Sequence, residues 1–250
     1  MGRFTGKVAI VTGGGRGIGR AISERLAEEG AAVAFNYSKS AKEAEQTVQS
    51  IKMRGGKAMA FKADIASQTE VKALFEAVIK DFGRLDILVN NAAIPGFFDN
   101  DGSLDAITEE QYDSVFDTNV KGVFLATKEA IKSLGSGSSI VTIVSNSGDL
   151  PNPLTTLYTA SKFAPRAFTQ VWAKELGARG IRVNALSIGG IDVGMTEIAS
   201  DELLQWLASK SPFNRLGKGS EVAAAVAFLC SEDSSWISGQ IIRVDGAAGP

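Results

Sequence analysis

The sequence contains no histidine, and this absence excludes several kinds of catalytic site. A Ser-His-Asp or Cys-His nucleophile needs an imidazole to take up the proton, and the usual zinc sites need imidazole or several thiolates. Cysteine is almost as rare, because Cys230 is the only one and no intrachain disulfide can form. We therefore predict no metal site, and proton transfer near neutral pH has to use another side chain.

An excess of one charge and a long apolar run are also missing. The 26 lysines and arginines nearly balance the 28 aspartates and glutamates, so nothing resembles the basic surface of a nucleic-acid-binding protein. No apolar run approaches the ~20 residues that span a bilayer, and a strand pattern begins at once, which leaves no room for a signal peptide. We expect a cytoplasmic protein that binds neither nucleic acid nor membranes.

Short apolar runs, several rich in β-branched residues, alternate with helical patterns along the whole chain, which is 250 residues long and 44% hydrophobic. Continuous apolar runs are typical of strands that are buried on both faces of a parallel sheet. The predicted strands are residues 7–12, 32–37, 57–63, 85–91, 139–145, 181–187 and 240–246. Alternation of this kind indicates an α/β fold with a doubly wound, seven-stranded parallel sheet.

Helical periodicity is clearest over residues 20–30, 70–83 and 221–233. The first two of these helices end at Gly30 and Gly83, which are plausible C-caps. The least regular stretches are 94–106 and 188–218. Because functional loops of this architecture follow the carboxyl ends of strands, we expect 188–218 to form a substrate loop or lid.

A glycine-rich loop, TGGGRGIG at residues 12–19, leaves the first predicted strand and opens the first helix. In this context Gly13 allows a tight turn, Gly17 lets the backbone approach a pyrophosphate, and Gly19 lets helix and strand pack closely. Ile18 lies between the last two. The helix N-terminus then offers unpaired N–H groups to phosphate. The alternative is a glycine-rich turn that binds no ligand.

The end of the second strand indicates which dinucleotide is bound. NAD sites usually carry an acid about 20 residues after the glycines, where it binds the ribose 2′-hydroxyl. Here the strand ends Tyr37-Ser38-Lys39, and the next acid is Glu43. Arg16, Ser38 and Lys39 can instead bind a 2′-phosphate, which favours NADP(H) over NAD(H). The alternative is that Arg16 and Lys39 are ordinary surface charges.

Several motifs occur in a fixed order. They are TGGGRGIG at 12–19, Asp64, NNAA at 90–93, Asn119, Ser145, YTASK at 158–162 and the final SGQIIRVDGAAG. Together they span essentially the whole chain and resemble the classical short-chain dehydrogenase/reductase family, including 3-oxoacyl-(acyl-carrier-protein) reductases and related carbonyl reductases. The resemblance implies a single Rossmann-type domain over residues 1–250, hydride transfer between NAD(P)(H) and a carbonyl or alcohol, and a homo-oligomer, either dimer or tetramer.

Tyr158 and Lys162 are four residues apart on a predicted helix and share one face. A free tyrosine has a pKa of ~10, too high for a base at neutral pH. A lysine ammonium ~6 Å away favours the phenolate by roughly 3 kcal/mol, or about 2 pKa units. We therefore predict that Tyr158 donates the proton in reduction and accepts it in oxidation. The resemblance adds that Lys162 binds the nicotinamide ribose.

The resemblance also implies a catalytic serine thirteen residues before the tyrosine, where Ser145 stands. Its hydroxyl can donate to a carbonyl oxygen that gains negative charge; Ser147 is the second candidate, and Ser145 alone could also simply bond the backbone. Asn119 is implied as the fourth catalytic residue, anchoring a water that links Lys162 to solvent. Without the resemblance, Asn119 is interpreted as a helix-interior or turn residue.

Further cofactor contacts are predicted from the place of Asp64 after the third strand, from the resemblance, and from the backbone at Ile191 or Val193, which could hold the carboxamide. They are Asp64, Ile65, Asn91, Ala92, Ile191 and Val193, together with Tyr158 and Lys162. Asp64 either accepts a hydrogen bond from adenine or caps the next helix. The sequence departs from the family pattern at Ala93, usually glycine, at Ile188, usually proline, and at Val193, often threonine, so Thr196 becomes a candidate to hold the carboxamide. Pro165 is expected to kink the catalytic helix.

The substrate is expected to contact residues 94–106 and 188–213. Their apolar side chains are Ile94, Phe97, Phe98, Ile188, Ile191, Val193, Met195, Leu203, Leu204, Trp206 and Phe213. Lys210 is the only basic residue in these stretches. A neutral, mostly apolar ketone or 3-oxoacyl thioester fits best, which predicts an NADPH-dependent reductase. The alternatives are an NAD-linked alcohol or sugar dehydrogenase working oxidatively, and a non-catalytic dinucleotide sensor.

Overall fold

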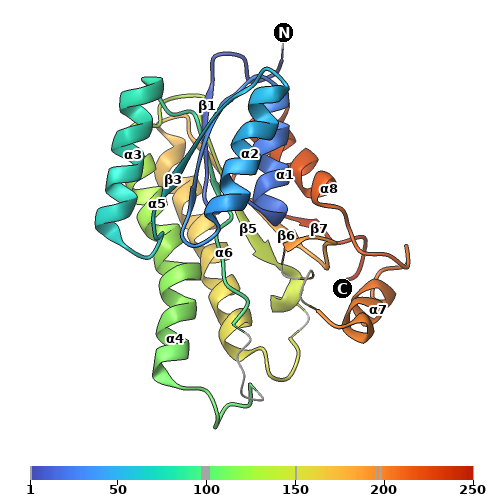
Figure 1. Cartoon of the computed structure of the whole chain (residues 1–250). Helices are drawn as coiled ribbons and strands as arrows, with labels where there is room; N and C mark the ends of the chain where they lie inside the picture. Colours follow the sequence, from blue (N-terminus) through green and yellow to red (C-terminus); the bar gives the residue numbers. More distant parts are fainter. Residues whose placement is uncertain (1, 97–101, 150, 195, 197–198, 250) are drawn as a thin grey trace.

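The structure is a computed structural model that describes residues 2–96, 102–149, 151–194, 196 and 199–249. Seven parallel strands form one sheet in the order β3-β2-β1-β4-β5-β6-β7 (Figure 1). Their bounds are β1 Val8–Val11, β2 Ala32–Tyr37, β3 Lys57–Lys62, β4 Ile87–Asn90, β5 Ser139–Ser145, β6 Arg182–Ile188 and β7 Ile241–Val244. All seven lie within a residue of, or inside, the predicted strands, so the predicted sheet is confirmed.

Helices cover both faces of the sheet (Figure 1). On one face lie α1 (Gly17–Glu28), α2 (Ala41–Met53) and α8 (Gly219–Cys230), and on the other α3 (Gln68–Phe82), α5 (Gly122–Ala130) and α6 (Thr156–Gly177). The remaining helices are α4 (Glu109–Phe116) and α7 (Asp201–Ser209), with short turns at Asp117–Lys121, Asn146–Gly148 and Glu232–Ser234. No helix in the described ranges has the length and apolarity that a membrane span requires.

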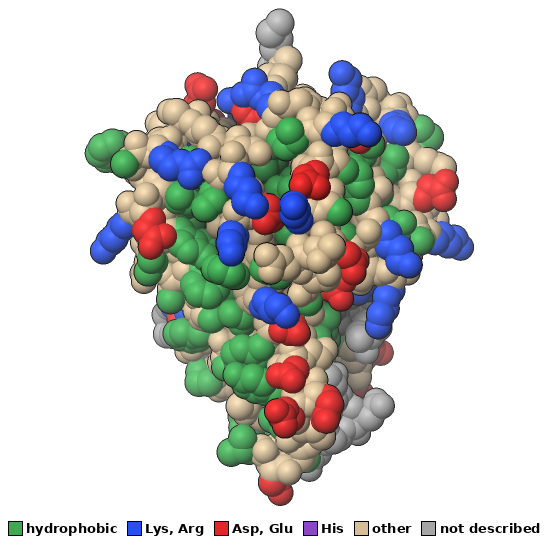
Figure 2. Space-filling view, turned by 90° about the vertical axis from the view of Figure 1, so that its left-hand side faces the viewer, with side chains coloured by type: hydrophobic (Ala, Val, Ile, Leu, Met, Phe, Trp, Pro, Cys, Tyr) green, Lys and Arg blue, Asp and Glu red, His purple; other side chains and the backbone are tan. Residues whose placement is uncertain are grey.

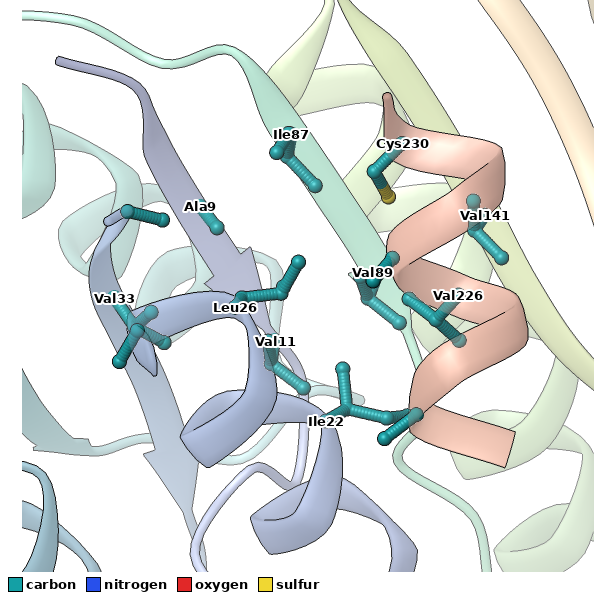
Figure 3. Close-up of a cluster of buried hydrophobic side chains, with 14 of the residues drawn as sticks. Ala9, Val11, Ile22, Leu26, Val33, Ile87, Val89, Val141, Val226 and Cys230 are labelled. Atoms are coloured by element: carbon teal, nitrogen blue, oxygen red, sulfur yellow. The ribbon is translucent and has the colours of Figure 1, made fainter. Parts of the chain in front are cut away.

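A buried apolar cluster joins the sheet to α1 and α8 (Figure 3). Ile22 and Leu26 of α1 and Val226 of α8 pack against Val11 and Val89 of the central strands. Burying a side chain of this size contributes about 1.5–3 kcal/mol. A second cluster lies under α3, α5 and α6 on the opposite face. Burial on both faces explains why the strands are continuous apolar runs.

The ends of α1 and α3 follow the sequence signals. Gly30 adopts a φ of +100° just after α1, and Gly83 adopts the left-handed conformation at the end of α3. Side chains favour neither conformation, so both glycines act as stop signals. By contrast, α6 continues without a break through Pro165, so the proline does not end this helix. The predicted kink stays a prediction.

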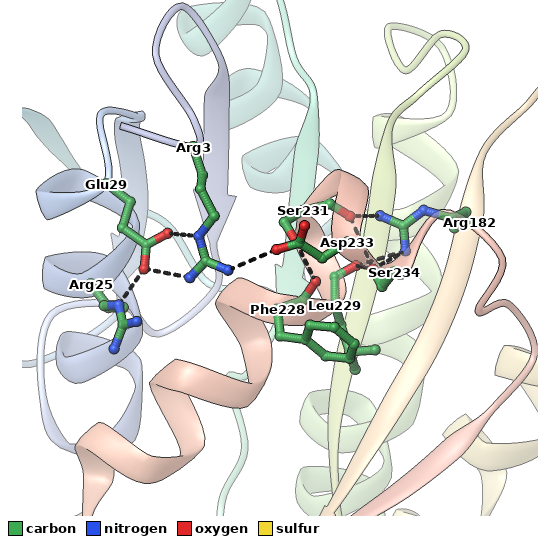
Figure 4. A network of polar contacts seen from close by, with 9 residues as sticks. All are labelled: Arg3, Arg25, Glu29, Arg182, Phe228, Leu229, Ser231, Asp233 and Ser234. Carbon is green, nitrogen blue, oxygen red and sulfur yellow. Dashed lines mark hydrogen bonds and ion pairs between the residues drawn. The ribbon is translucent and has the colours of Figure 1, made fainter. Parts of the chain in front are cut away.

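A polar network closes the amino-terminal edge of the sheet (Figure 4). Arg3 donates two hydrogen bonds to Glu29, at 2.6 and 2.8 Å, and also contacts Asp233 at 3.5 Å. Arg182, at the start of β6, donates to the carbonyl oxygens of Leu229 and Ser231 at the end of α8. These bonds tie the first residues, α1, α8 and β6 together at the edge opposite the predicted site.

The strand order reverses direction between β1 and β4. The chain runs outward from β1 through β2 to β3, then returns to β4 and continues outward to β7. In open α/β sheets, ligands bind beyond the carboxyl ends of the strands at such a point. The fold therefore places the candidate site beside the loops that follow β1, β4 and β5.

Candidate active site

The glycine loop between β1 and α1 is shaped by contacts that exclude side chains. Gly13 has a φ of +63°, and a Cβ on Gly19 would lie only 2.2 Å from the carbonyl oxygen of Gly13. Both positions therefore require glycine, as the sequence predicts. Arg16 precedes α1 without capping it by a side-chain hydrogen bond. The first N–H groups of α1 thus stay available for an anion, which fits a dinucleotide pyrophosphate.

Thr12 and Asn36 hold this loop in place, although the sequence analysis assigned neither side chain a role. The hydroxyl oxygen of Thr12 accepts hydrogen bonds from the backbone N–H groups of Asn91 (2.9 Å) and Ala92 (3.0 Å). The amide of Asn91 donates back to the Thr12 carbonyl at 2.9 Å. The loops after β1 and β4 are therefore joined at the switch point, which places Asn91 and Ala92 beside the glycines.

Asn36 is the other missed residue. Its side-chain oxygen accepts from the N–H of Gly13 at 3.1 Å, and its amide donates to the carbonyl of Ala63 at 2.8 Å. It therefore links the loops after β1 and β3 through the end of β2. A buried asparagine inside an apolar strand is the signal that could have identified it, because a buried amide needs partners.

The residues predicted to select the cofactor lie on neighbouring loops. Tyr37 ends β2 and is half-buried, and Ser38 and Lys39 follow it with exposed side chains. Arg16 is exposed on the loop after β1, the strand paired with β2. Three donors thus stand beyond the same edge of the sheet, and β2 ends without a carboxylate. This donor set fits a 2′-phosphate.

Asp64 and Ile65 follow β3. Asp64 is exposed, and its carboxylate accepts a hydrogen bond from the backbone of Ala66 at 2.9 Å. The suggestion that Asp64 caps the next helix is wrong, because Ser67 caps α3 by accepting from the N–H of Glu70. Ile65 is buried and packs against Gly122. The adenine contact of Asp64 remains a prediction.

Ser145, Tyr158 and Lys162 come together at the carboxyl end of β5. Ser145 is the last residue of β5, and its side chain forms a hydrogen bond with that of Tyr158 in the first turns of α6. The Lys162 Nζ lies 5.8 Å from the centroid of the Tyr158 ring and donates to the carbonyl of Ile143 at 3.2 Å.

Burial sets the pKa values of this pair. It raises the pKa of Tyr158 above its ordinary value, against the opposing effect of the Ser145 hydrogen bond. It also lowers the pKa of Lys162 to about 8. The expectation of a lowered tyrosine pKa is therefore wrong for the polypeptide by itself, since desolvation raises the pKa of Tyr158 and outweighs the Ser145 hydrogen bond. At neutral pH Tyr158 keeps its proton and Lys162 remains mostly charged.

Asn119 is buried in a π-helical turn, Asp117–Lys121, between α4 and α5. Its side chain exchanges two hydrogen bonds with the backbone of Ile94, at 2.9 and 3.0 Å, and donates to Ser161 at 3.0 Å. Asn119 thus fixes the start of the loop after β4 against α6, one residue before Lys162. Such π turns are frequent at functional sites.

The segment after β6 reaches the glycine loop. A Cβ on Gly17 would lie 2.9 Å from the Cα of Gly194. Ile191 is buried and pairs with Gly217, and Val193 packs toward Gly219 at the start of α8. The Thr196 hydroxyl donates to the carbonyl of Ile191. The hydroxyl oxygen can still accept a hydrogen bond, so the carboxamide role of Thr196 stays a prediction.

The predicted substrate walls are described in part, because Phe97, Phe98 and Met195 lie outside the described residues. The segment 188–218 is not irregular throughout, since α7 begins after Ser200, which accepts a hydrogen bond from the N–H of Leu203. Leu203, Trp206 and Phe213 are exposed on α7 and the turn that follows. They are therefore not core residues. The Lys210 Nζ lies 4.4 Å from the centroid of the Trp206 ring.

Known proteins resemble this chain along its whole length. A family model described as enoyl-(acyl carrier protein) reductase matches residues 13–247. The 3-oxoacyl-(acyl-carrier-protein) reductase of Staphylococcus aureus is 41% identical over 242 residues, covering 96% of this chain and 97% of that protein. A probable tetrahydroxynaphthalene reductase of Zymoseptoria tritici is 38% identical over 259 positions, covering 98% and 96%. A solved short-chain dehydrogenase from Burkholderia cenocepacia, in complex with NADP, is 40% identical with a TM-score of 0.91, covering 98% and 99%.

Proposed function

Because the chain belongs to the short-chain dehydrogenase/reductase family, we propose that it is an NADP(H)-dependent oxidoreductase that reduces a neutral, mostly apolar ketone or 3-oxoacyl substrate to the alcohol. The observation that carries the proposal is the meeting of Ser145, Tyr158 and Lys162 at the carboxyl end of β5, one strand from the switch point. A protein that only bound the dinucleotide would not need this arrangement.

NADPH, when bound, supplies the hydride. The chain's own residues then handle the oxygen of the substrate. Ser145 donates a hydrogen bond to the carbonyl oxygen as negative charge develops there, and Tyr158 donates the proton. At neutral pH the phenol of Tyr158 is protonated, as reduction requires, but its raised pKa makes it a weaker acid, so the proton leaves only as negative charge develops on the carbonyl oxygen. The Lys162 charge stabilises the phenolate left behind.

The glycine loop and α1 are proposed to hold the pyrophosphate, through Gly13, Gly17, Ile18 and Gly19. Asn91, Ala92, Ile191 and Val193 line the nicotinamide side, and Lys162 binds the ribose. Asp64 and Ile65 lie at the adenine side. Asn119 anchors a water that leads from Lys162 to solvent, a role consistent with its burial beside Ser161.

The substrate is proposed to lie between the loop after β4 and segment 188–218, with α7 as a lid. The exposed Leu203, Trp206 and Phe213 support an apolar ligand, since a site of this kind is lined by apolar and aromatic side chains. Similarity to a 3-oxoacyl-(acyl-carrier-protein) reductase and to a probable tetrahydroxynaphthalene reductase supports a substrate of this type. The cytoplasmic location stays a prediction.

Arg16 and Lys39 are proposed to select NADPH through its 2′-phosphate. A hydrogen bond to a charged group contributes about 1.5–3 kcal/mol, so Arg16→Ala should weaken NADPH binding by roughly 10- to 100-fold and NADH binding much less. Fluorescence titration measures both. Arg20→Ala is the control, because Arg20 pairs with Glu24 one turn further along α1. Equal losses for the two cofactors would remove Arg16 from the phosphate site.

The experiment that tests the proposed function combines binding and turnover. The protein is titrated with NADPH and NADH, and the tighter cofactor is then tested against a panel of apolar ketones and 3-oxoacyl thioesters. Tight NADPH binding with ketone-dependent oxidation supports the reductase. Preference for NADH with alcohol oxidation would instead support a dehydrogenase, and binding without turnover of any substrate would support a dinucleotide sensor.

A further inference from the structure

An ion-pair cluster around the buried Arg166 lies beside the catalytic residues; Asp149 is half-buried and Arg243 is exposed. Arg166 donates to both carboxylate oxygens of Asp149, from NH1 at 2.9 Å and from NH2 at 2.7 Å. The same NH2 donates to the hydroxyl of Ser187 at 3.0 Å, and Arg243 reaches Asp149 at 3.3 Å. A forked pair of this geometry fixes both the distance and the orientation of the two groups.

Arg166 belongs to the catalytic face of α6. Tyr158, Lys162 and Arg166 follow one another at four-residue spacing, so they lie along one side of the helix. Long side chains on a helix point back toward its N-terminus, which is the end that carries Tyr158. The Arg166 side chain can therefore reach the carboxyl edge of the sheet, although its backbone lies two helical turns beyond Tyr158. Arg166 is only 9% exposed.

Asp149 belongs to the same short segment as Ser145. Residues 145–149 begin at the end of β5 and form one 3-10 turn, in which the N–H of Ser147 donates to the Ser145 hydroxyl at 3.1 Å. Gly148 lies against the Phe163 ring so closely that a Cβ there would be 2.2 Å from a ring carbon. The segment therefore rests on α6 at two points, the Phe163 ring and the Arg166 fork.

Two buried polar atoms in this region are left without a hydrogen bond. Among the described residues, neither the Arg166 Nε nor the Ser147 Oγ has a partner. An unpaired buried polar atom destabilises a fold and requires an explanation.

We propose that Arg166 is a positioning residue, whose fork with Asp149 fixes the Ser145 segment in register with Tyr158 and Lys162. Helix α6 positions Tyr158 and Lys162, and the Arg166–Asp149 pair positions the Ser145 hydroxyl, which donates to the carbonyl oxygen of the substrate. This inference rests on the proposed function, since it assigns Arg166 to the same reaction.

The chain offers a control with the same contact geometry at the opposite edge of the sheet, although the Arg84 side chain is 56% exposed and that of Arg166 only 11%. Arg84 donates to both carboxylate oxygens of Asp86, at 2.9 and 2.6 Å, and Lys7 lies 3.5 Å from that carboxylate. Each aspartate therefore has one forked arginine and one further cation. Only the Asp149 cluster contacts the catalytic segment.

The test compares Arg166→Met, Arg166→Lys and Arg84→Met with the wild type. Arg166→Met is expected to lower kcat by about 100-fold, the effect of a displacement of about 1 Å in a catalytic group, with an unchanged NADPH dissociation constant. Arg166→Lys keeps the charge but not the fork and should give an intermediate kcat. Arg84→Met should keep the wild-type kcat even where its unfolding temperature falls.

Amide hydrogen exchange gives a readout that needs no substrate. Arg166→Met should accelerate exchange at Ser147 and Asp149, and Arg84→Met should not. Wild-type kcat in Arg166→Met, unchanged exchange at these amides, or an equal loss of kcat in Arg84→Met would each overturn the inference. If Arg166→Met does not fold, kcat and amide exchange at Ser147 and Asp149 are measured in Arg166→Lys instead, and wild-type values there would overturn the inference. Absence of turnover in the wild type would instead count against the proposed function, while the exchange measurement would still test the fork.

Discussion

At the scale of one residue, the buried charge of Lys162 lowers the stability of the fold. Lys162 is only 6% exposed, and its pKa falls from 10.5 to about 8 because burial disfavours the ammonium. A shift of this size corresponds to about 3 kcal/mol of lost stability at neutral pH. The hydrogen bond to the carbonyl of Ile143 compensates in part. We therefore expect the chain to be more stable without this charge.

Lys162→Met should raise the free energy of unfolding at pH 7 by up to about 3 kcal/mol, less the lost hydrogen bond. The unfolded chain holds its lysine proton up to pH 10.5, whereas the folded chain releases it near pH 8. The free energy of unfolding of the wild type therefore rises between pH 8 and pH 10.5 as the buried lysine loses its charge. Over the same range, the stability difference between Lys162→Met and the wild type becomes smaller. Urea unfolding of both proteins at pH 7 and pH 10 measures the difference. A constant difference would contradict the pKa of Lys162.

Individual site residues were predictable to different degrees. Tyr158 and Lys162 could be predicted because a four-residue spacing on a helix places them on one face, whereas Ser145 followed from the family resemblance. Thr12 and Asn36 were not predicted, since each acts through backbone groups of loops that follow other strands, although an asparagine inside an apolar strand was a usable signal for Asn36. The effect of burial on Tyr158 was also missed, because spacing gives the distance to Lys162 but not the depth of the pair.

At the scale of elements, the join between β1 and α1 depends most strongly on residue size. Gly19→Ala would place a Cβ 2.2 Å from the Gly13 carbonyl oxygen, and such overpacking costs about 1–3 kcal/mol. It should also weaken nucleotide binding, because the loop carries the N–H groups. Thermal unfolding and NADPH titration measure the two effects.

Gly177→Ala is the control for this substitution, since Gly177 also lies in a helix and a Cβ there meets nothing within 4 Å. It should stabilise the protein by up to about 1 kcal/mol and leave binding unchanged. Similar behaviour of the two variants would mean that the close contact at Gly19 is not what shapes the loop.

The strands were predictable as elements because burial on both faces makes each a continuous apolar run. Of the helices that the sequence did not single out, α7 is the most instructive. It was expected to be irregular, although Ser200 followed by Asp201 and Glu202 is a helix-start signal. The Arg166–Asp149 fork joins residues 17 apart across an irregular connection, and no periodicity in the sequence encodes such a contact.

At the scale of the whole molecule, the surface supports the predicted homo-oligomer. Apolar side chains gather on the face that carries α3, α4 and α5 (Figure 2). Four exposed apolar side chains lie on α4, α5 and α6: Tyr112, Phe124, Phe163 and Val171. Exposed patches of this kind are typical of interfaces between subunits. We infer that these helices pair with a second copy of the chain.

A double substitution tests this surface. The wild type should have the mass of a dimer or tetramer of the 26.2 kDa chain by light scattering. Phe124→Glu with Val171→Glu should shift the protein toward the monomer, because charge is disfavoured in an apolar interface. Met53→Glu is the control, since Met53 is 82% exposed on α2, away from these helices. A wild-type monomer would refute the predicted assembly.

The most direct test of the whole account is the catalytic tyrosine. Tyr158→Phe removes the proton donor and leaves the ring, so kcat for ketone reduction should fall by about 10²–10⁴-fold while the NADPH dissociation constant stays unchanged. Tyr112→Phe, on the exposed surface of α4, should keep wild-type activity. The measurement is kcat and NADPH affinity of both variants beside the wild type. Full ketone reduction by Tyr158→Phe would contradict the proposed mechanism.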